Sequence, residues 1–157
     1  MKKYLSFIGI LIIVGLIVAV SGCTSSDTAA TSNKTFENKI IKFSYPDNVK
    51  IIDNSTSNAL RISILPSTST DPNDNPIGVI NDYRDNKNTV LQQRSDIQNL
   101  TISGYKAVSS KDDQFLYLDV FLDNNTNAHY IEISVNPDQQ DVFNTIKNSL
   151  TIKSASF

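Results

Sequence analysis

The chain has 157 residues, of which 14 are Lys or Arg and 16 are Asp or Glu, so its net charge is −2 at pH 7. A charge this small, without a basic cluster, argues against nucleic acid as a partner and against electrostatic binding to anionic lipid. The single cysteine excludes an internal disulfide, and the length fits one signal segment followed by one domain.

The first 23 residues have the pattern of a lipoprotein export signal. Lys2 and Lys3 give a positive start, Leu5–Val20 is an apolar run, and Val20-Ser21-Gly22-Cys23 fits a lipobox. We therefore expect residues 1–22 to be the signal peptide and Cys23 to carry the lipid, which places the protein on the outward, extracytoplasmic face of the cell membrane. An uncleaved signal anchor is the alternative, because an apolar run of about 16 residues is only slightly shorter than the ~20 that span a bilayer.

Residues 23–35 are rich in Ser, Thr and Ala and predict a flexible tether, so the folded domain is expected over residues 36–153. The acidic residues are nearly all aspartate, with Glu37 and Glu132 as the only glutamates. Asp and Asn favour turns over helix interiors, which is typical of a domain built from strands and loops.

Alternation of apolar and polar residues predicts about six strands, over 39–45, 49–53, 60–64, 100–108, 114–123 and 128–135. The first two are expected to pair as a hairpin across the turn at Pro46-Asp47-Asn48. The strand over 114–123 is apolar on both faces, which predicts a central strand that is covered on each side.

Helices are predicted in the middle of the chain and near its end. Asn75-Pro76 ahead of Ile77–Tyr83, and the spacing of apolar residues within 89–98, predict two short helices or one broken helix. Asn136-Pro137 with Gln139 predicts a capped helix start, followed by one apolar stripe made of Val142, Phe143, Ile146 and Leu150. The fold class predicted is α+β, an antiparallel sheet flanked by helices.

Three stretches resemble the PsbP-like family. Phe43–Val49 resembles the family's opening F-x-Y-P-x-G-W, although Asn48 replaces the glycine and Val49 the tryptophan. Leu100–Ala107 resembles its glycine-interrupted middle strand, and Phe143–Leu150 resembles its terminal helix. The resemblance implies an α/β/α sandwich and a non-catalytic surface domain, in a stand-alone lipoprotein of a bacterium or methanogen-type archaeon.

The spacing of Asp71, Asn73 and Asn75 partly matches a calcium-binding EF-hand loop, with Asp82 at the twelfth position counted from Asp71. Pro76 stands where that loop needs glycine, and Asp82 is shorter than the usual glutamate. A solvated loop is therefore expected here, and neither a metal nor a cofactor is predicted.

Catalytic residues are not predicted either. His129, the only histidine, has no cysteine partner for a zinc site and no accompanying serine motif, so it is expected to be a surface strand residue. Asp112 and Asp113 fall in a predicted turn, where burial and a raised pKa are not expected. Tyrosines at several strand positions are interpreted as sheet core rather than as a ligand surface: Tyr45, Tyr105, Tyr117 and Tyr130.

Four Asn-X-Ser/Thr sequons begin at Asn33, Asn54, Asn99 and Asn124. Asn54 and Asn124 lie in predicted turns and are the candidates for N-glycosylation. Chance alone gives a similar number of sequons in a chain this rich in Asn, Ser and Thr.

The function expected from these patterns is that of a lipid-anchored, extracytoplasmic binding or accessory domain. Its expected partners are membrane lipid, through acylated Cys23, and an unknown membrane or envelope protein. Two alternatives stay open, a surface hydrolase or transferase with an unrecognised site, and a surface protein that binds a glycan or small ligand.

Overall fold

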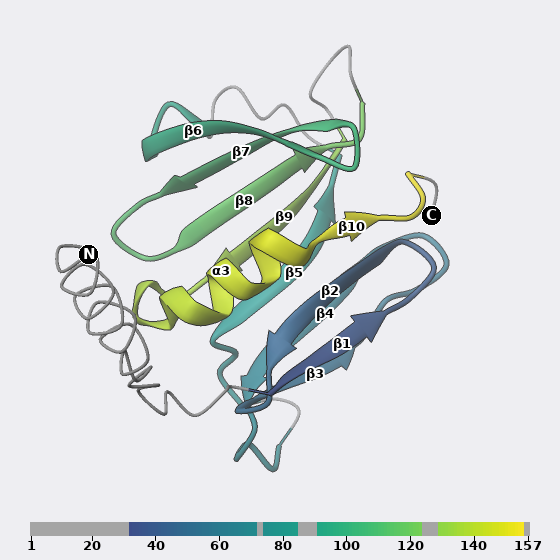
Figure 1. The fold of residues 1–157 in the computed structure, drawn as a ribbon, viewed down its shortest axis with the longest axis vertical. Helices are drawn as coiled ribbons and strands as arrows, with labels where there is room; N and C mark the ends of the chain where they lie inside the picture. The colour runs from purple at the N-terminus through teal and green to yellow at the C-terminus, as the bar shows by residue number, and fades with distance from the viewer. Residues whose placement is uncertain (1–31, 72–73, 85–90, 124–128, 156–157) are drawn as a thin grey trace, which may run out of the picture. The chain divides into compact units, whose positions relative to one another are not determined.

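The computed structural model describes residues 32–71, 74–84, 91–123 and 129–155, which form two antiparallel sheets and one α-helix (Figure 1). The large sheet has seven strands in the order β3 (Val49–Asp53), β4 (Arg61–Pro66), β5 (Gly78–Tyr83), β9 (Tyr130–Val135), β8 (Leu116–Phe121), β7 (Tyr105–Lys111) and β6 (Ser95–Ile102). The small sheet has the order β1 (Asn33–Glu37), β2 (Ile41–Pro46) and β10 (Thr151–Ile152). A 3₁₀ turn, η1 (Pro137–Gln139), leads into helix α3 (Gln140–Ser149).

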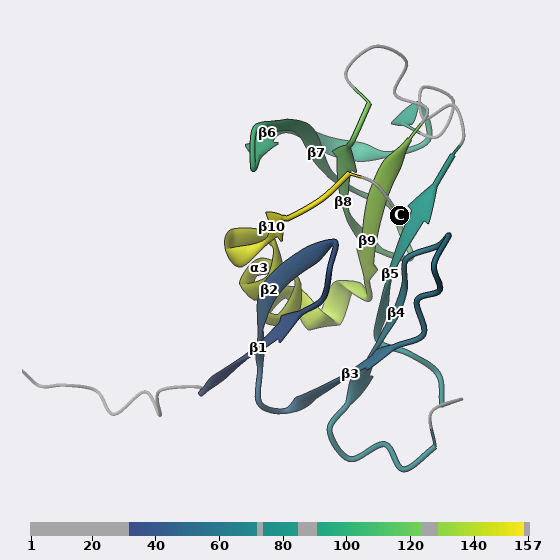
Figure 2. The ribbon, with the colours of Figure 1, turned by 90° about the vertical axis from the view of Figure 1, so that its right-hand side faces the viewer.

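Helix α3 and the β1–β2 hairpin lie side by side on the same face of the large sheet (Figure 2). The main core fills the space between these two layers, where β-branched and aliphatic side chains pack from both sides. Its most buried members are each at most 1 % exposed: Ile41, Phe43, Leu60, Ile64, Ile80, Leu118, Val120, Ile131, Ile133, Val135 and Ile146.

The opposite face of the large sheet carries a second, smaller apolar cluster. Val108, Phe121 and Tyr130 are buried there, and Leu91, from the connection between β5 and β6, packs against them. Every residue of β8 is buried, which confirms the prediction of a central strand covered on both faces. Within the described residues, no helix is long and apolar enough to span a membrane.

The prediction of helix in the middle of the chain is wrong over Gly78–Tyr83 and from Ser95 onward. Gly78–Tyr83 is strand β5 and Ser95–Ile102 is strand β6, while residues 85–90 lie outside the described part. The signal of Asn75-Pro76 was outweighed because Val79 and Ile80 suit a strand, and Ile80 is fully buried opposite Ile62 of β4 and Ile133 of β9.

The predicted hairpin of 39–45 with 49–53 is also wrong. Asp47 and Asn48 do turn the chain, but β2 pairs with β1 and β10 in the small sheet, whereas β3 pairs with β4 in the large one. The chain turns a corner between layers here, so that Phe43 can face the core from one side and Val49 from the other.

The sheet content was underestimated and the helix content overestimated. The described residues hold ten strands rather than six, and one α-helix on one face rather than helices on both. The broader α+β class is confirmed.

The C-terminal helix is confirmed, with Val142, Phe143 and Ile146 buried on one stripe. Its predicted capping box is wrong, since the side chain of Asn136 makes no capping hydrogen bond. Instead the Asn136 N–H donates to the carbonyl of Ile77 (2.8 Å), which fixes the helix start against β5.

Candidate functional site

A polar cleft of about 550 Å³ runs along one side of η1 and α3. One wall comes from β1 and the corner between β2 and β3, and the other from η1 and α3. Six of its eleven lining residues carry a side-chain amide: Asn33, Asn48, Gln139, Gln140, Asn144 and Asn148. We call this feature the amide cleft.

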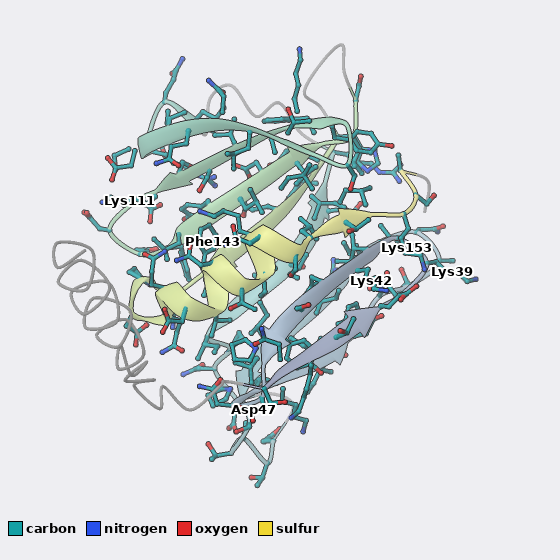
Figure 3. The ribbon with its side chains drawn as sticks, viewed as in Figure 1. Lys39, Lys42, Asp47, Lys111, Phe143 and Lys153 are labelled. Atoms are coloured by element: carbon teal, nitrogen blue, oxygen red, sulfur yellow. The ribbon has the colours of Figure 1, made fainter. Side chains whose placement is uncertain are left out.

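The two walls of the amide cleft are fixed to each other by hydrogen bonds. Ser149 Oγ, near the end of α3, accepts the backbone N–H of Ser44 in β2 (2.8 Å) and donates to the carbonyl of Thr145 (2.7 Å). The first wall is itself held together at the corner that is marked by Asp47 in Figure 3. There the Asp47 N–H donates to the carbonyl of Ser32 (3.1 Å), and Lys34 Nζ donates to the carbonyl of Asp47 (3.1 Å). The cleft is therefore a preformed feature of the fold.

The chemistry of the amide cleft suits a neutral, hydrogen-bonding ligand. Asn and Gln side chains both donate and accept, so they match hydroxyl groups and peptide amides. The two ionisable lining residues are Asp138 and Asp141, which stand in the first turns of η1 and α3, where negative charge is favoured. These two carboxylates disfavour an anionic ligand.

Charged residues on the opposite face of the large sheet form a buried ionic cluster. Arg94 reaches over β8 and β9, where its guanidinium contacts Asp119 and Glu132 at 2.8 Å each. Asp119 and Glu132 are directly opposite each other in the two strands. The guanidinium also stacks 3.4 Å from the centre of the Tyr117 ring, and Tyr117 Oη donates to Asp112 Oδ2 (2.8 Å).

The ionisation states in this cluster are fixed by their surroundings. Burial opposes ionisation of Asp112, but hydrogen bonds from Tyr117 Oη and from the N–H groups of Gln114 and Phe115 outweigh it and hold its pKa below the usual value. Burial raises the pKa of Tyr117, and the hydrogen bond to Asp112 raises it further. Neither group exchanges its proton near neutral pH, so this arrangement favours a role in holding the fold.

The residues that the sequence singled out are scattered over the domain. Cys23 and Asn124 lie outside the described residues, and Asn54 is exposed just after β3. Asp112 lies in the expected turn, at the edge of the ionic cluster. His129 precedes β9, is half-buried, and has a pKa lowered by burial and by the charge of Arg84.

The imitation calcium loop does not come together as a site in the described residues. Asn73 lies outside them, and Asp82 Oδ1 accepts the N–H of Leu60 (2.7 Å). Among all the residues that the structure describes, no group of three or more His, Cys, Asp or Glu side chains is placed to hold a metal ion. The four strand tyrosines divide between two faces, since Tyr45 and Tyr105 pack on the main core and Tyr117 and Tyr130 lie on the opposite side.

Sequence reasoning missed both the amide cleft and the ionic cluster. A signal for the cluster was present in Asp119, a carboxylate between Leu118 and Val120 in a strand predicted to be covered on both faces. A buried carboxylate needs a cationic or hydrogen-bonding partner, so a distant arginine should have been sought.

Comparison with known proteins identified no relative of this chain. No protein-family model, no curated protein and no solved structure matches the chain. The resemblance to the PsbP-like family therefore stays a prediction from sequence.

Proposed function

We propose that the protein is a lipid-anchored, extracytoplasmic, PsbP-related lipoprotein whose domain is a non-catalytic binding or accessory subunit of a membrane or envelope complex. The observation that carries the proposal is the amide cleft, a preformed concave surface lined by hydrogen-bonding side chains from both layers of the domain. Asp112, whose pKa is lowered, and Tyr117, whose pKa is raised, are hydrogen-bonded to each other on the other face of the large sheet, away from this cleft.

The start of the domain supports a partner near the membrane. Asn33, the first residue of β1, lines the amide cleft and follows Cys23 by ten residues (33 − 23). Ten residues reach at most about 35 Å when fully extended. With a lipid on Cys23, the cleft would therefore work within that distance of the bilayer, where a membrane or envelope protein is the nearest large partner.

A second candidate function, the binding of a glycan, is favoured by the composition of the same cleft. Amide and carboxylate side chains match the hydroxyl groups of sugars, and its charge of −2, from Asp138 and Asp141, tolerates neutral ligands. No aromatic side chain is found among the described residues that line it, so a glycan would be held by hydrogen bonds without ring stacking.

Site-specific photo-cross-linking in the native membrane tests the proposal. A benzophenone side chain is placed at Asn48 or Asn144 in the cleft of the full-length protein, with exposed Asn58 as the matched control position. We expect one protein to be cross-linked from both cleft positions, to be absent from Asn58, and to be lost when Cys23→Ser prevents anchoring.

Equal cross-linking from Asn58, or none from either cleft position, would contradict a docking role for the cleft. Carbohydrate in the cross-linked product, without protein, would instead select the glycan-binding function. Each outcome is read by mass spectrometry of the tagged protein.

A further inference from the structure

A second pocket, of about 470 Å³, lies against the β6–β7 hairpin and differs in character from the amide cleft. Seven described residues line it, and five of them are apolar: Leu91, Leu100, Ala107, Val108 and Phe121. Leu100 and Ala107 belong to the main core, so the apolar side chains on this face of the sheet are those of Leu91, Val108 and Phe121. Val108 and Phe121 belong to the apolar cluster on the face of the large sheet opposite α3, against which Leu91 packs. We call this feature the apolar pocket.

The size and walls of the apolar pocket fit an extended hydrocarbon chain. Small-molecule sites in proteins have volumes of about 300–1,000 Å³ and are lined mostly by apolar side chains. Apolar walls that face an open volume gain free energy when another apolar group covers them. Asn99 and Lys106 are the two polar lining residues, and both are exposed to solvent.

Among the described residues that line the apolar pocket, Lys106 is the one charged side chain and contributes +1, whereas those of the amide cleft contribute −2. In the cross-strand pairing Lys106 stands opposite Thr101, and within the described residues its ammonium makes no ion pair. Asn99 stands opposite Val108, so its amide and the Lys106 ammonium come from neighbouring strands of the same hairpin. An anionic oxygen acid at this position would be paired by the lysine and hydrogen-bonded by the amide.

We propose that the apolar pocket binds a single-chain amphiphile with an anionic head, namely a long-chain fatty carboxylate. The hydrocarbon chain lies against Leu91, Val108 and Phe121, and the carboxylate faces Lys106. This site is separate from the amide cleft and does not depend on the function proposed for that cleft.

The probe for this site is a palmitic acid that carries a diazirine and an alkyne, added to native membranes that contain the full-length protein. After illumination, we expect the labelled residues to concentrate in peptides that contain Val108 or Phe121. Excess oleate should remove this labelling. Labels spread evenly over exposed peptides would overturn the proposal.

Variants separate the role of the lysine from general damage to the fold. Lys106→Glu should lower labelling about tenfold, because it replaces attraction of the carboxylate by repulsion, and Lys106→Arg should keep most of it. Lys50→Glu, an equal charge change at an exposed lysine of the far edge strand β3, should leave labelling unchanged. Equal labelling of wild type and Lys106→Glu would overturn the assignment of the head group.

An uncharged probe and a phosphate competitor complete the test. The corresponding palmityl alcohol should label wild type and Lys106→Glu equally, since it has no charge for the lysine to recognise. Competition by lysophosphatidate but not by oleate would replace the carboxylate by a phosphate head and so overturn the proposal in its stated form.

Discussion

Replacement of Arg94 by methionine should strongly destabilise the fold, because it leaves two carboxylates buried without their counter-charge. The side chains of Arg94, Asp119 and Glu132 are 4 %, 0 % and 13 % exposed, and both ion pairs are 2.8 Å long. Breaking a buried pair by removing one partner costs about 3–5 kcal/mol, whereas exposed pairs contribute about 0–1 kcal/mol. We therefore expect Arg94→Met to lower the free energy of unfolding by about 3–5 kcal/mol, a large part of the ~5–15 kcal/mol typical of a domain.

Urea unfolding of the full chain in detergent, followed by pulse proteolysis at pH 7, measures this loss. The matched control is Lys111→Met, which removes an ion pair with Asp96 whose side chains are 49 % and 62 % exposed, and which should cost less than about 1 kcal/mol. Adding Asp119→Leu to Arg94→Met should recover part of the stability, since it removes one of the uncompensated charges. A loss for Arg94→Met no larger than that for Lys111→Met would refute the view that the cluster is desolvated.

Three further predictions address separate parts of the chain. The folded-state pKa of Asp112 lies below its ordinary 3.8, so its ionised form stabilises the fold above that pH, and this contribution is lost as the pH falls through the folded-state pKa. Asp112→Asn should therefore flatten the acid limb of a curve of stability against pH below about pH 4. An unchanged acid limb would contradict the hydrogen bonds assigned to Asp112. Gly78→Ala should destabilise by about 1–3 kcal/mol in thermal unfolding, since the new Cβ would meet the Ser134 carbonyl oxygen at 2.7 Å; a neutral effect would mean that β5 and β9 separate easily. Cys23→Ser should abolish incorporation of an alkyne fatty acid and release the protein from the membrane fraction. A wild-type protein without fatty acid, together with a variant that stays in the membrane fraction, would point to an uncleaved anchor.

Strands were predicted best where apolar side chains recur at every second residue of the sequence. In β2 the alternation places Ile41 and Phe43 in the core, and in β9 it places Ile131 and Ile133 there, so the pattern in sequence and the burial in the fold agree. The period of side chains along a strand is a local property, which is why it can be read without knowledge of the fold.

The errors concern properties that only tertiary structure decides. Asn75-Pro76 is a sound helix start by itself, but pairing with β4 and β9 stabilises strand at Gly78–Tyr83. A turn at Asp47 likewise looks the same whether the next strand pairs back or enters another sheet. The partners of β2 are β1 and β10, and the second lies at the far end of the chain.

The candidate sites likewise depend on contacts between distant segments, which local sequence patterns do not reveal. The amide cleft brings Asn33 and Asn48 beside η1 and α3, and no spacing in the sequence links these segments. The ionic cluster could be predicted only in part. Asp119 in an apolar strand predicts a cationic partner, but that partner, Arg94, lies in a stretch predicted to be helix.

Strand β10 has a consequence for when the domain can fold. Ile152 pairs with Ile41 of β2, 111 residues earlier (152 − 41), and the Ser149 hydroxyl meets the Ser44 N–H across 105 residues. In a chain exported N-terminus first, Ile41 and Phe43 of the β1–β2 hairpin would stay exposed until α3 and β10 had emerged to cover them. Contacts between distant segments slow folding to the range of milliseconds to seconds. If the chain is exported N-terminus first, as proposed, the domain can complete its fold only after β10 has crossed the membrane.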